Sequence, residues 1–372
     1  MGASFENLKF RFKLLLRKLW FLPAAFSLIA IVTVTVAYYS ARLAPDKLPF
    51  TIEGGAVESI LTILGTSMLT VAVFALSTLV GAISRASQTT TPHAVPLIIE
   101  DRAAQTAISI FVGAFLFSIG GIIGLSSGIY SDAGRLVLFF VTLGVVVVVV
   151  WALIQWIGRI SAMGRTTETI KLVEHAAKKA LERLVKSPNF GCLPRSGPLP
   201  QGTEITCGVT GYIQYIAFDR LAEIAQDADL RVHLAHLPGA FVAASDVCMS
   251  VEGEADETVT ESLRGALTIG EERTFEYDPR YGLIVLAEIA ARALSAAIND
   301  SGTAIDVITA QTRLLSESAP AFAPVKLESA ATRITLPEMG PRIWSPPRSV
   351  RSPVTALRAS KWCFTLSQLS RC

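Results

Sequence analysis

Charged residues are scarce in this chain, and over four stretches they are missing altogether. Asp, Glu, Lys and Arg make up 17% of the 372 residues, whereas soluble domains contain about a quarter. No acidic, basic or histidine side chain occurs in residues 20–40, 59–83, 107–129 and 136–157. Helices of that length cross a hydrocarbon layer of about 30 Å, and in lipid a helix satisfies its own backbone hydrogen bonds. The sequence therefore predicts four transmembrane spans.

The same absence excludes several transport mechanisms. Proton relays, ion-coupled carriers and voltage sensors place ionisable side chains inside their spans, and the four predicted spans contain none. A passive channel lined by hydroxyl groups and glycines stays open, because such a pore needs no charge within it.

Motifs for nucleotide, metal and hydrolase chemistry are missing as well. The chain has no GxxxxGK[ST], no GxGxxG after a strand, no GxSxG and no HExxH. The net charge of +2, without a basic run interleaved with aromatics, predicts no nucleic-acid partner. No cofactor is predicted.

Five cysteines follow the fourth predicted span and show no CxxC pair: Cys192, Cys207, Cys248, Cys363 and Cys372. We expect reduced thiols, with neither a disulfide framework nor a zinc site. His233 and His236 form an HxxH on a predicted strand, where a spacing of three places the two rings on opposite faces. No metal site is therefore predicted.

Positive charges flank the predicted spans unequally. One side carries nine Lys and Arg residues and the other side three, which predicts a bacterial plasma (inner) membrane protein with both termini in the cytoplasm. The nine are Lys9, Arg11, Lys13, Arg17, Lys18, Arg85, Arg102, Arg159 and Arg165, and the three are Arg42, Lys47 and Arg135. The first apolar run is longer than that of a signal peptide, so we expect an uncleaved anchor.

The predicted fold is an α-helical transmembrane bundle of four spans, followed by a small α+β cytoplasmic domain. The predicted segments are a basic amphipathic segment (1–19), the transmembrane unit (20–158), a cytoplasmic helix continuing span four (159–186), a Pro-rich linker (187–203), the α+β domain (204–318) and a Pro-rich basic tail (319–372). Inside the domain, strands are expected at 205–216, 230–236 and 241–251, and helices at 219–228, 257–267, 278–295 and 299–316.

The tail has poor hydrophobic periodicity, many prolines and few acids, which is typical of a disordered segment. Two interpretations remain open for it. The reading frame shifts near Pro347, or the tail is a basic arm that lies on anionic lipid.

Three glycines in span three, Gly120, Gly124 and Gly128, are spaced by four. This spacing predicts a flat stripe on which another helix packs closely. An oligomer interface or a pore wall is the functional alternative.

Several short motifs resemble the family of four-span bacterial membrane proteins called domain of unknown function 2254, and the resemblance extends to about residue 316. The motifs are Ser87-Gln88 with Pro92, Asp101-Arg102 and Gln105; Gly211-Tyr212-Ile213-Gln214; Pro238-Gly239 with Phe241-Val242; and Arg273-Thr274, Asp278, Tyr281-Gly282, Ala293-Leu294-Ser295, Ile298-Asn299-Asp300 and Thr303-Ala304. Where members of that family commonly read Leu-Ser-Pro-Gly-Ile-Asn-Asp-Pro, this chain has Ala296-Ala297 and Ser301 in place of Pro-Gly and the second Pro. The resemblance implies membrane location and topology, and it implies no activity.

The carboxyl-terminal motif supplies the candidate site, which comprises Arg273, Asp278, Arg292, Asn299, Asp300 and Thr303. One interpretation is helix caps and a buried polar tie between two helices. The other is a ligand or anion pocket formed by two helix amino ends with Arg273. Acid–base catalysis by Asp278 and Asp300 would need both carboxylates in one cleft.

Three function classes follow from these features. The first is a structural or regulatory integral membrane protein, with the lipid bilayer, a second copy of the chain and a cytoplasmic protein or small ligand as partners. The second is an oligomeric passive channel lined by spans two and three. The third is a membrane-tethered enzyme that uses the Asp278/Asp300 region.

Overall fold

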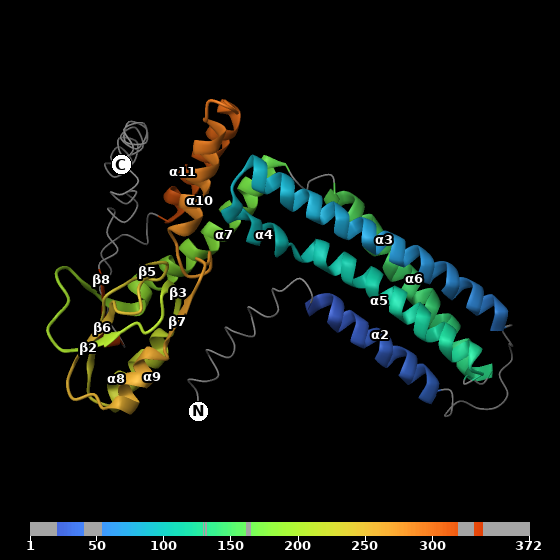
Figure 1. The fold of residues 1–372 in the computed structure, drawn as a ribbon, viewed down its shortest axis with the longest axis horizontal. Helices are drawn as coiled ribbons and strands as arrows, with labels where there is room; N and C mark the ends of the chain where they lie inside the picture. The colour runs from blue at the N-terminus through green and yellow to red at the C-terminus, as the bar shows by residue number, and fades with distance from the viewer. Residues whose placement is uncertain are drawn as a thin grey trace. The chain divides into compact units, whose positions relative to one another are not determined.

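The structure, a computed structural model, describes residues 21–40, 54–128, 130, 132–160, 165–318 and 331–337, which divide between two compact units (Figure 1). One unit contains the described residues up to Leu172 together with Ala291–Ala304. The other contains Val173–Ala290 and the described residues from Ile305 onward. The predicted amphipathic segment 1–19 lies outside the described residues.

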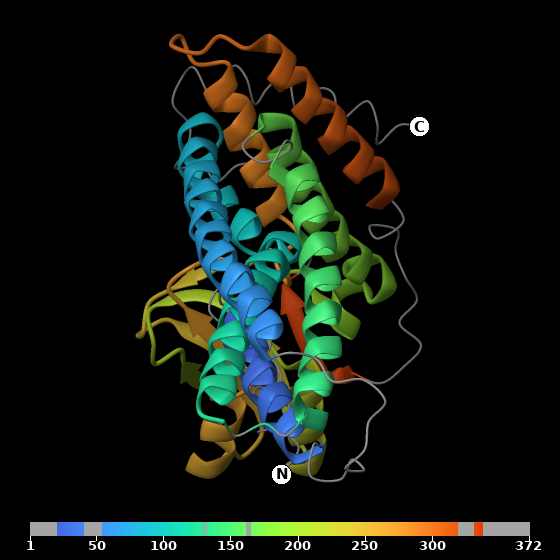
Figure 2. The same cartoon turned by 90° about the vertical axis from the view of Figure 1, so that its right-hand side faces the viewer.

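Long apolar helices form the first unit (Figure 2). They are α2 (Phe21–Ser40), α3 (Gly54–Thr89), α5 (Arg102–Ser126) and α6 (Asp132–Ile160), and the short helices η1 (Pro92–Ala94) and α4 (Val95–Ile99) lie between α3 and α5. Among the described residues, three helical segments are long and apolar enough to cross a membrane: Gly55–Thr89, Arg102–Ser126 and Gly134–Ile160. Helix α2 coincides with the first predicted span, and the count of four remains a prediction.

Helix α5 is the central helix of this unit, because it packs against α2, α3 and α6. Small residues allow the close approach of α3 and α5. A Cβ added at Gly121 would lie 2.9 Å from Cδ1 of Leu61, and one added at Gly65 would lie 3.2 Å from Cβ of Ser118. Substitution of these glycines would therefore push the two helices apart.

The predicted glycine stripe is only partly realised. Gly124 is buried, and a side chain there would collide with the ring of Tyr130. Gly120 is half-buried. Gly128 is exposed, lies beyond the end of α5 and has a φ of +66°. The stripe does not reach Gly128 because the helix ends at Ser126, and a glycine in the left-handed region commonly follows a helix end.

Helix α7 (Thr166–Lys186) follows α6 after a short gap. The sequence predicts one unbroken helix over 136–185, but residues 161–164 lie outside the described residues. Helix α7 itself is continuous, and its amphipathic pattern buries Ile170, Val173, Ala177, Ala180 and Leu184.

The second unit contains two sheets, with order β1-β8-β4-β6-β2 and β5-β3-β7. Strand β8 is parallel to both of its neighbours, β1 and β4, and the other pairs are antiparallel. The elements are η2 (Pro188–Gly191), β1 (Cys192–Arg195), β2 (Thr203–Thr206), β3 (Gly211–Ile216), α8 (Phe218–Asp227), β4 (Arg231–Leu234), β5 (Phe241–Val242), β6 (Val247–Glu252), α9 (Glu257–Arg264), β7 (Leu267–Gly270), α10 (Tyr281–Ala293), α11 (Ser301–Ser318) and β8 (Ala331–Pro337).

One hydrophobic core joins both sheets to α8 and α9. Strand alternation directs Val232 and Leu234 of β4 into this core, together with Ile213 of β3 and Met249 of β6. The α+β class is therefore confirmed. The predicted strands 205–216 and 241–251 are each two strands, which belong to different sheets.

The domain boundaries differ from the prediction at both ends. Strand β1 lies within the segment 187–203 predicted as a linker, and β8 lies within the segment 319–372 predicted as a disordered tail. Both strands are short and flanked by prolines, which hides their periodicity. Ile334 and Leu336 are nevertheless fully buried, so β8 is an interior strand. The tail beyond Pro337, with its two interpretations, lies outside the described residues.

We expect Ile334→Ala to destabilise the soluble unit by about 2–5 kcal/mol, because it opens a cavity at an interior strand. The matched control is Ile308→Ala, whose side chain is 44% exposed, with an expected change of about 0.5 kcal/mol or less. The measurement is the rate at which a maleimide labels buried Cys248 in the detergent-solubilised full chain, read by mass spectrometry. Equal labelling rates in both variants would show that β8 is not part of the core.

Candidate functional site

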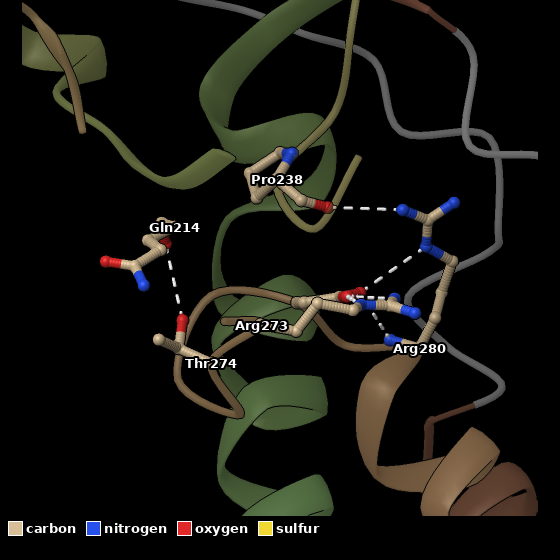
Figure 3. A network of polar contacts seen from close by, with 6 residues as sticks. Gln214, Pro238, Arg273, Thr274 and Arg280 are labelled. Carbon is tan, nitrogen blue, oxygen red and sulfur yellow. Dashed lines mark hydrogen bonds and ion pairs between the residues drawn. The ribbon is translucent and has the colours of Figure 1, made fainter. Parts of the chain in front are cut away.

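A buried carboxylate organises the segment 271–280, which connects β7 to α10. Asp278 is 2% exposed. Its Oδ2 accepts hydrogen bonds from Nε of Arg273 at 3.0 Å and from Nη2 of the same side chain. Its Oδ1 accepts from the backbone N–H of Arg280 at 3.1 Å and lies 3.4 Å from Nε of Arg280. Figure 3 shows the two arginines converging from different sides.

Local sequence explains how this carboxylate is placed. Asp278 precedes Pro279, whose ring fixes the backbone. An Asp at such a position accepts a hydrogen bond from the N–H two residues onward, which here belongs to Arg280. The carbonyl of Asp278 also accepts from the N–H of Tyr281 at 3.2 Å, at the start of α10.

A turn from a distant part of the chain completes the arrangement. Nη2 of Arg280 donates to the carbonyl of Pro238 at 3.2 Å. The next residue, Gly239, has a φ of +84°, and a side chain there would overlap the carboxylate of Asp278. Glycine is therefore required twice at this position, once by the left-handed backbone and once by the close approach.

Aromatic rings cover the ion pairs. The guanidinium of Arg273 lies 4.8 Å from the ring centroid of Tyr281, and the rings of Phe275 and Tyr281 are 4.5 Å apart. Burial raises the pKa of Tyr281 to about 12, so the phenol stays neutral at physiological pH. Each carboxylate oxygen of Asp278 thus contacts an arginine, so its charge is compensated within this group.

The other predicted site residues lie in the other compact unit. Asp300 caps α11, because its Oδ1 accepts from the N–H of Thr303 at 3.0 Å and its Oδ2 from the hydroxyl of Thr303 at 2.7 Å. These bonds lower the pKa of Asp300. Asn299 has a left-handed φ of +50° and donates its N–H to the carbonyl of Ser295. Asp300 is therefore the residue that caps α11.

Arg292 is exposed, and no ion pair joins its side chain to another residue of the described ranges. The predicted cluster therefore divides into an Asp278 group and an Asp300 group. An acid–base pair made of Asp278 and Asp300 finds no support in this geometry, because the oxygens of both carboxylates are already hydrogen-bonded within their own groups.

Contacts to α7 lie next to the Asp278 group and were missing from the sequence prediction. Nη1 of Arg183 donates to the carbonyl of Glu276 at 2.7 Å, and its Nη2 donates to Oε1 of the same residue at 3.1 Å. A side chain added at Gly282 of α10 would collide with Ala177 of α7. Two further ion pairs, Arg313 with Glu174 and Lys178 with Glu317, join α11 to α7.

A second polar group lies on the sheet face that points away from the core. His233 is 6% exposed, its Nδ1 lies 2.8 Å from Oγ1 of Thr335, and its Nε2 lies 3.3 Å from Oε1 of Glu252. Burial lowers the pKa of His233, and the nearby Glu252 opposes this shift only in part. The alternation of β4 could have shown that this histidine faces away from Val232 and Leu234.

In the helical unit, Asp101 caps the start of α5. Its Oδ1 accepts from the N–H of Ala103 at 3.1 Å, and its Oδ2 pairs with Nε of Arg159 at 2.7 Å. This ion pair brings the beginning of α5 and the end of α6 together, so both ends lie on the same side of the helical unit.

Long apolar helices followed by an α+β unit define the general class of membrane protein with an α+β domain. The chain belongs to the family described as Predicted membrane protein (DUF2254), which matches residues 17–343. The match includes β8 and therefore extends beyond the resemblance drawn from the motifs.

Uncharacterized proteins of Mycobacterium bovis and Mycobacterium tuberculosis are each 26% identical to this chain over 282 residues. The alignment covers 71% of this chain and 52% of each relative, so the chain spans about half the length of the curated relatives that it matches. No solved structure matches the chain.

We expect Asp278→Asn to cost about 3–5 kcal/mol of unfolding free energy, because it leaves two partly buried arginines without their anion. Asp300→Asn is the matched control, because Asn is an equally good helix cap and the site is exposed. The unfolding free energies of the two variants are measured by urea unfolding of the solubilised full chain, monitored by circular dichroism. Equal midpoints for the two variants would show that Asp278 is not a structural tie.

The buried His233 predicts that stability falls in acid. Below its ordinary value of about 6.5 the unfolded state takes up a proton that the folded state resists, so stability rises with pH between the lowered folded pKa and about 6.5. We expect His233→Gln to flatten this dependence below about pH 6.5. His175→Gln, at an exposed position on α7, is the matched control. If the unfolding free energy of His233→Gln still depends on pH as in the parent, other groups cause the dependence.

Proposed function

We propose that this chain is an integral membrane protein of structural or regulatory function, in which α7 transmits the state of the soluble α+β domain to the last membrane helix. The observation that carries this proposal is the attachment of α7. It is one continuous helix, yet its residues up to Leu172 belong to the helical unit and those from Val173 belong to the soluble unit.

The soluble unit holds α7 by packing and by charge. Ala177 fits against Gly282 with no room for a side chain, and Arg183 is bonded to both the backbone and the carboxylate of Glu276. Glu276 lies two residues before Asp278. A rearrangement at Asp278 can therefore reach α7 along two residues of backbone and then through the hydrogen bonds between Glu276 and Arg183. Closely packed helices shift as rigid elements rather than deform.

The topology that goes with this proposal is four spans with both termini in the cytoplasm. It is supported by the distribution of Lys and Arg, and by the Asp101–Arg159 ion pair, which is consistent with antiparallel α5 and α6. The proposed partners are the lipid bilayer, a second copy of the chain and a small ligand or protein that binds the soluble domain.

A passive channel is the lesser alternative. Its proposed wall, α3 with α5, is closed within one copy by the contacts at Gly65 and Gly121. A pore would then have to use the exposed face of α3, where hydroxyls recur. Those of Ser59, Thr62, Thr66 and Thr70 each donate to a carbonyl of the preceding turn. Such self-satisfied hydroxyls tolerate lipid, so they do not by themselves require a pore.

We expect Gly282→Val to loosen α7 and, through it, the end of α6. The added side chain separates α10 from α7, so amides of residues 173–186 and of the last turn of α6 should exchange hydrogen faster in nanodiscs. Mass spectrometry of the exchange measures this. Ala291→Val is the matched control, because it places the same side chain on an exposed position of α10.

Arg183→Gln is the milder variant for use if Gly282→Val does not fold. It should raise exchange at the same two places to a smaller extent, because it removes the bonds to Glu276 and inserts nothing. Faster exchange in α7 with no change at the end of α6 would contradict transmission.

A further inference from the structure

A charged depression of about 520 Å³ lies at one end of the five-stranded sheet. It is lined by Asp229 before β4, Arg231 at the start of β4, Glu252 and Gly253 at the end of β6, and Arg333 in β8. Apart from Gly253, every lining residue is charged, so the depression suits a polar occupant.

The strand register places the charges in a row. Val232 pairs with Ile334, so the preceding residues Arg231 and Arg333 are neighbours on adjacent parallel strands. Arg231 is also directly opposite Glu252. Two guanidinium groups side by side on neighbouring strands repel each other unless an anion lies between or beside them.

The anions that now compensate this repulsion are held loosely. Arg333 pairs with Asp229 at 2.7 Å, but the side chain of Asp229 is 88% exposed. Arg231 lies 3.9 Å from Glu252 and is 70% exposed. Exposed ion pairs of this kind contribute little to stability, so an incoming ligand can replace them at small cost.

Glu252, in contrast, lies beside a buried histidine. Nε2 of His233 is buried, makes no hydrogen bond within the described residues and lies 3.3 Å from Oε1 of Glu252. His233 is itself held by Thr335, the next outward-facing residue of β8 after Arg333. The depression thus has two arginines on one side and a carboxylate on the other.

We propose that this depression binds a small zwitterion of the amino-acid class, with its anionic group between Arg231 and Arg333 and its ammonium group at Glu252. The alternating charges match a molecule that carries both signs a few atoms apart, whereas a simple anion would face Glu252 and Asp229 as well. This inference rests on the proposed function, because the zwitterion would be the ligand of the domain that we propose to be regulatory.

The experiment is calorimetric titration of the full chain in nanodiscs with glycine, β-alanine and γ-aminobutyrate, which separate the two charges by increasing distances. Inorganic phosphate and ethylammonium carry one sign each and serve as single-charge probes. At least one zwitterion should bind about tenfold or more tightly than either single-charge probe. Binding of none of the three, or equal binding of phosphate, would overturn the proposal.

Arg231→Gln and Arg333→Gln locate the site, and each should weaken zwitterion binding by about tenfold or more. Arg231 is mostly exposed, so its variant is expected to fold. Arg220→Gln, on α8 with only Glu223 as its partner in the described ion pairs, is the matched control and should bind as the parent does. Binding that survives in Arg231→Gln would place the zwitterion elsewhere and overturn the assignment.

Hydrogen exchange with and without the bound zwitterion separates this inference from the proposed function. Protection at residues 229–233 with no change in α7 would support the site and contradict transmission. Absence of binding would overturn the site, and the Gly282→Val experiment would still decide transmission.

Discussion

A buried carboxylate, Asp278, fixes the segment that leads into α10 of the α+β unit. Removing Asp278 from solvent costs several kcal/mol unless cations and hydrogen bonds compensate it, and Arg273 and Arg280 supply both. Residues around Asp278 depend on the position of its carboxylate. Arg280 binds the turn at Pro238, Gly239 leaves space for the carboxylate, and the same segment presents Glu276 to α7. One buried charge therefore connects a turn, a helix start and the helix that leads to the membrane unit.

The helical unit follows a different constraint, because in lipid the backbone and the hydroxyl groups must find partners within the protein. Buried Ser109 and Ser118 of α5, like the exposed hydroxyls of α3, donate to carbonyls of the preceding turn. Packing is then left to small residues, and Gly121 lets α5 approach Leu61 of α3. The observed ion pair, Asp101 with Arg159, lies at the helix ends rather than within the spans, as expected where charge is expensive in hydrocarbon.

The soluble unit thus has two polar groups of different character. The Asp278 group is closed, with its charges paired and covered by aromatic rings. The depression at Arg231 and Arg333 is open, and its ion pairs are solvent-exposed and weak. Closed networks stabilise one arrangement of the chain, whereas open ones exchange partners readily. The first suits mechanical attachment of α7, and the second suits reversible binding of a ligand.

Features that depend on near neighbours were readable from the sequence: the apolar lengths of the helices, the caps at Asp101 and Asp300, and the α+β class. The contact between Arg280 and Asp278 could also have been predicted from the sequence, since Arg280 lies two residues after Asp278. Only the tertiary structure showed β8 as an interior strand, the Arg280–Pro238 bond across 42 residues and the Arg183–Glu276 bond across 93. The physical reason is that helix and strand propensities depend on residues a few positions apart. A contact between residues that are distant in the sequence forms only on folding, and no local sequence pattern predicts it.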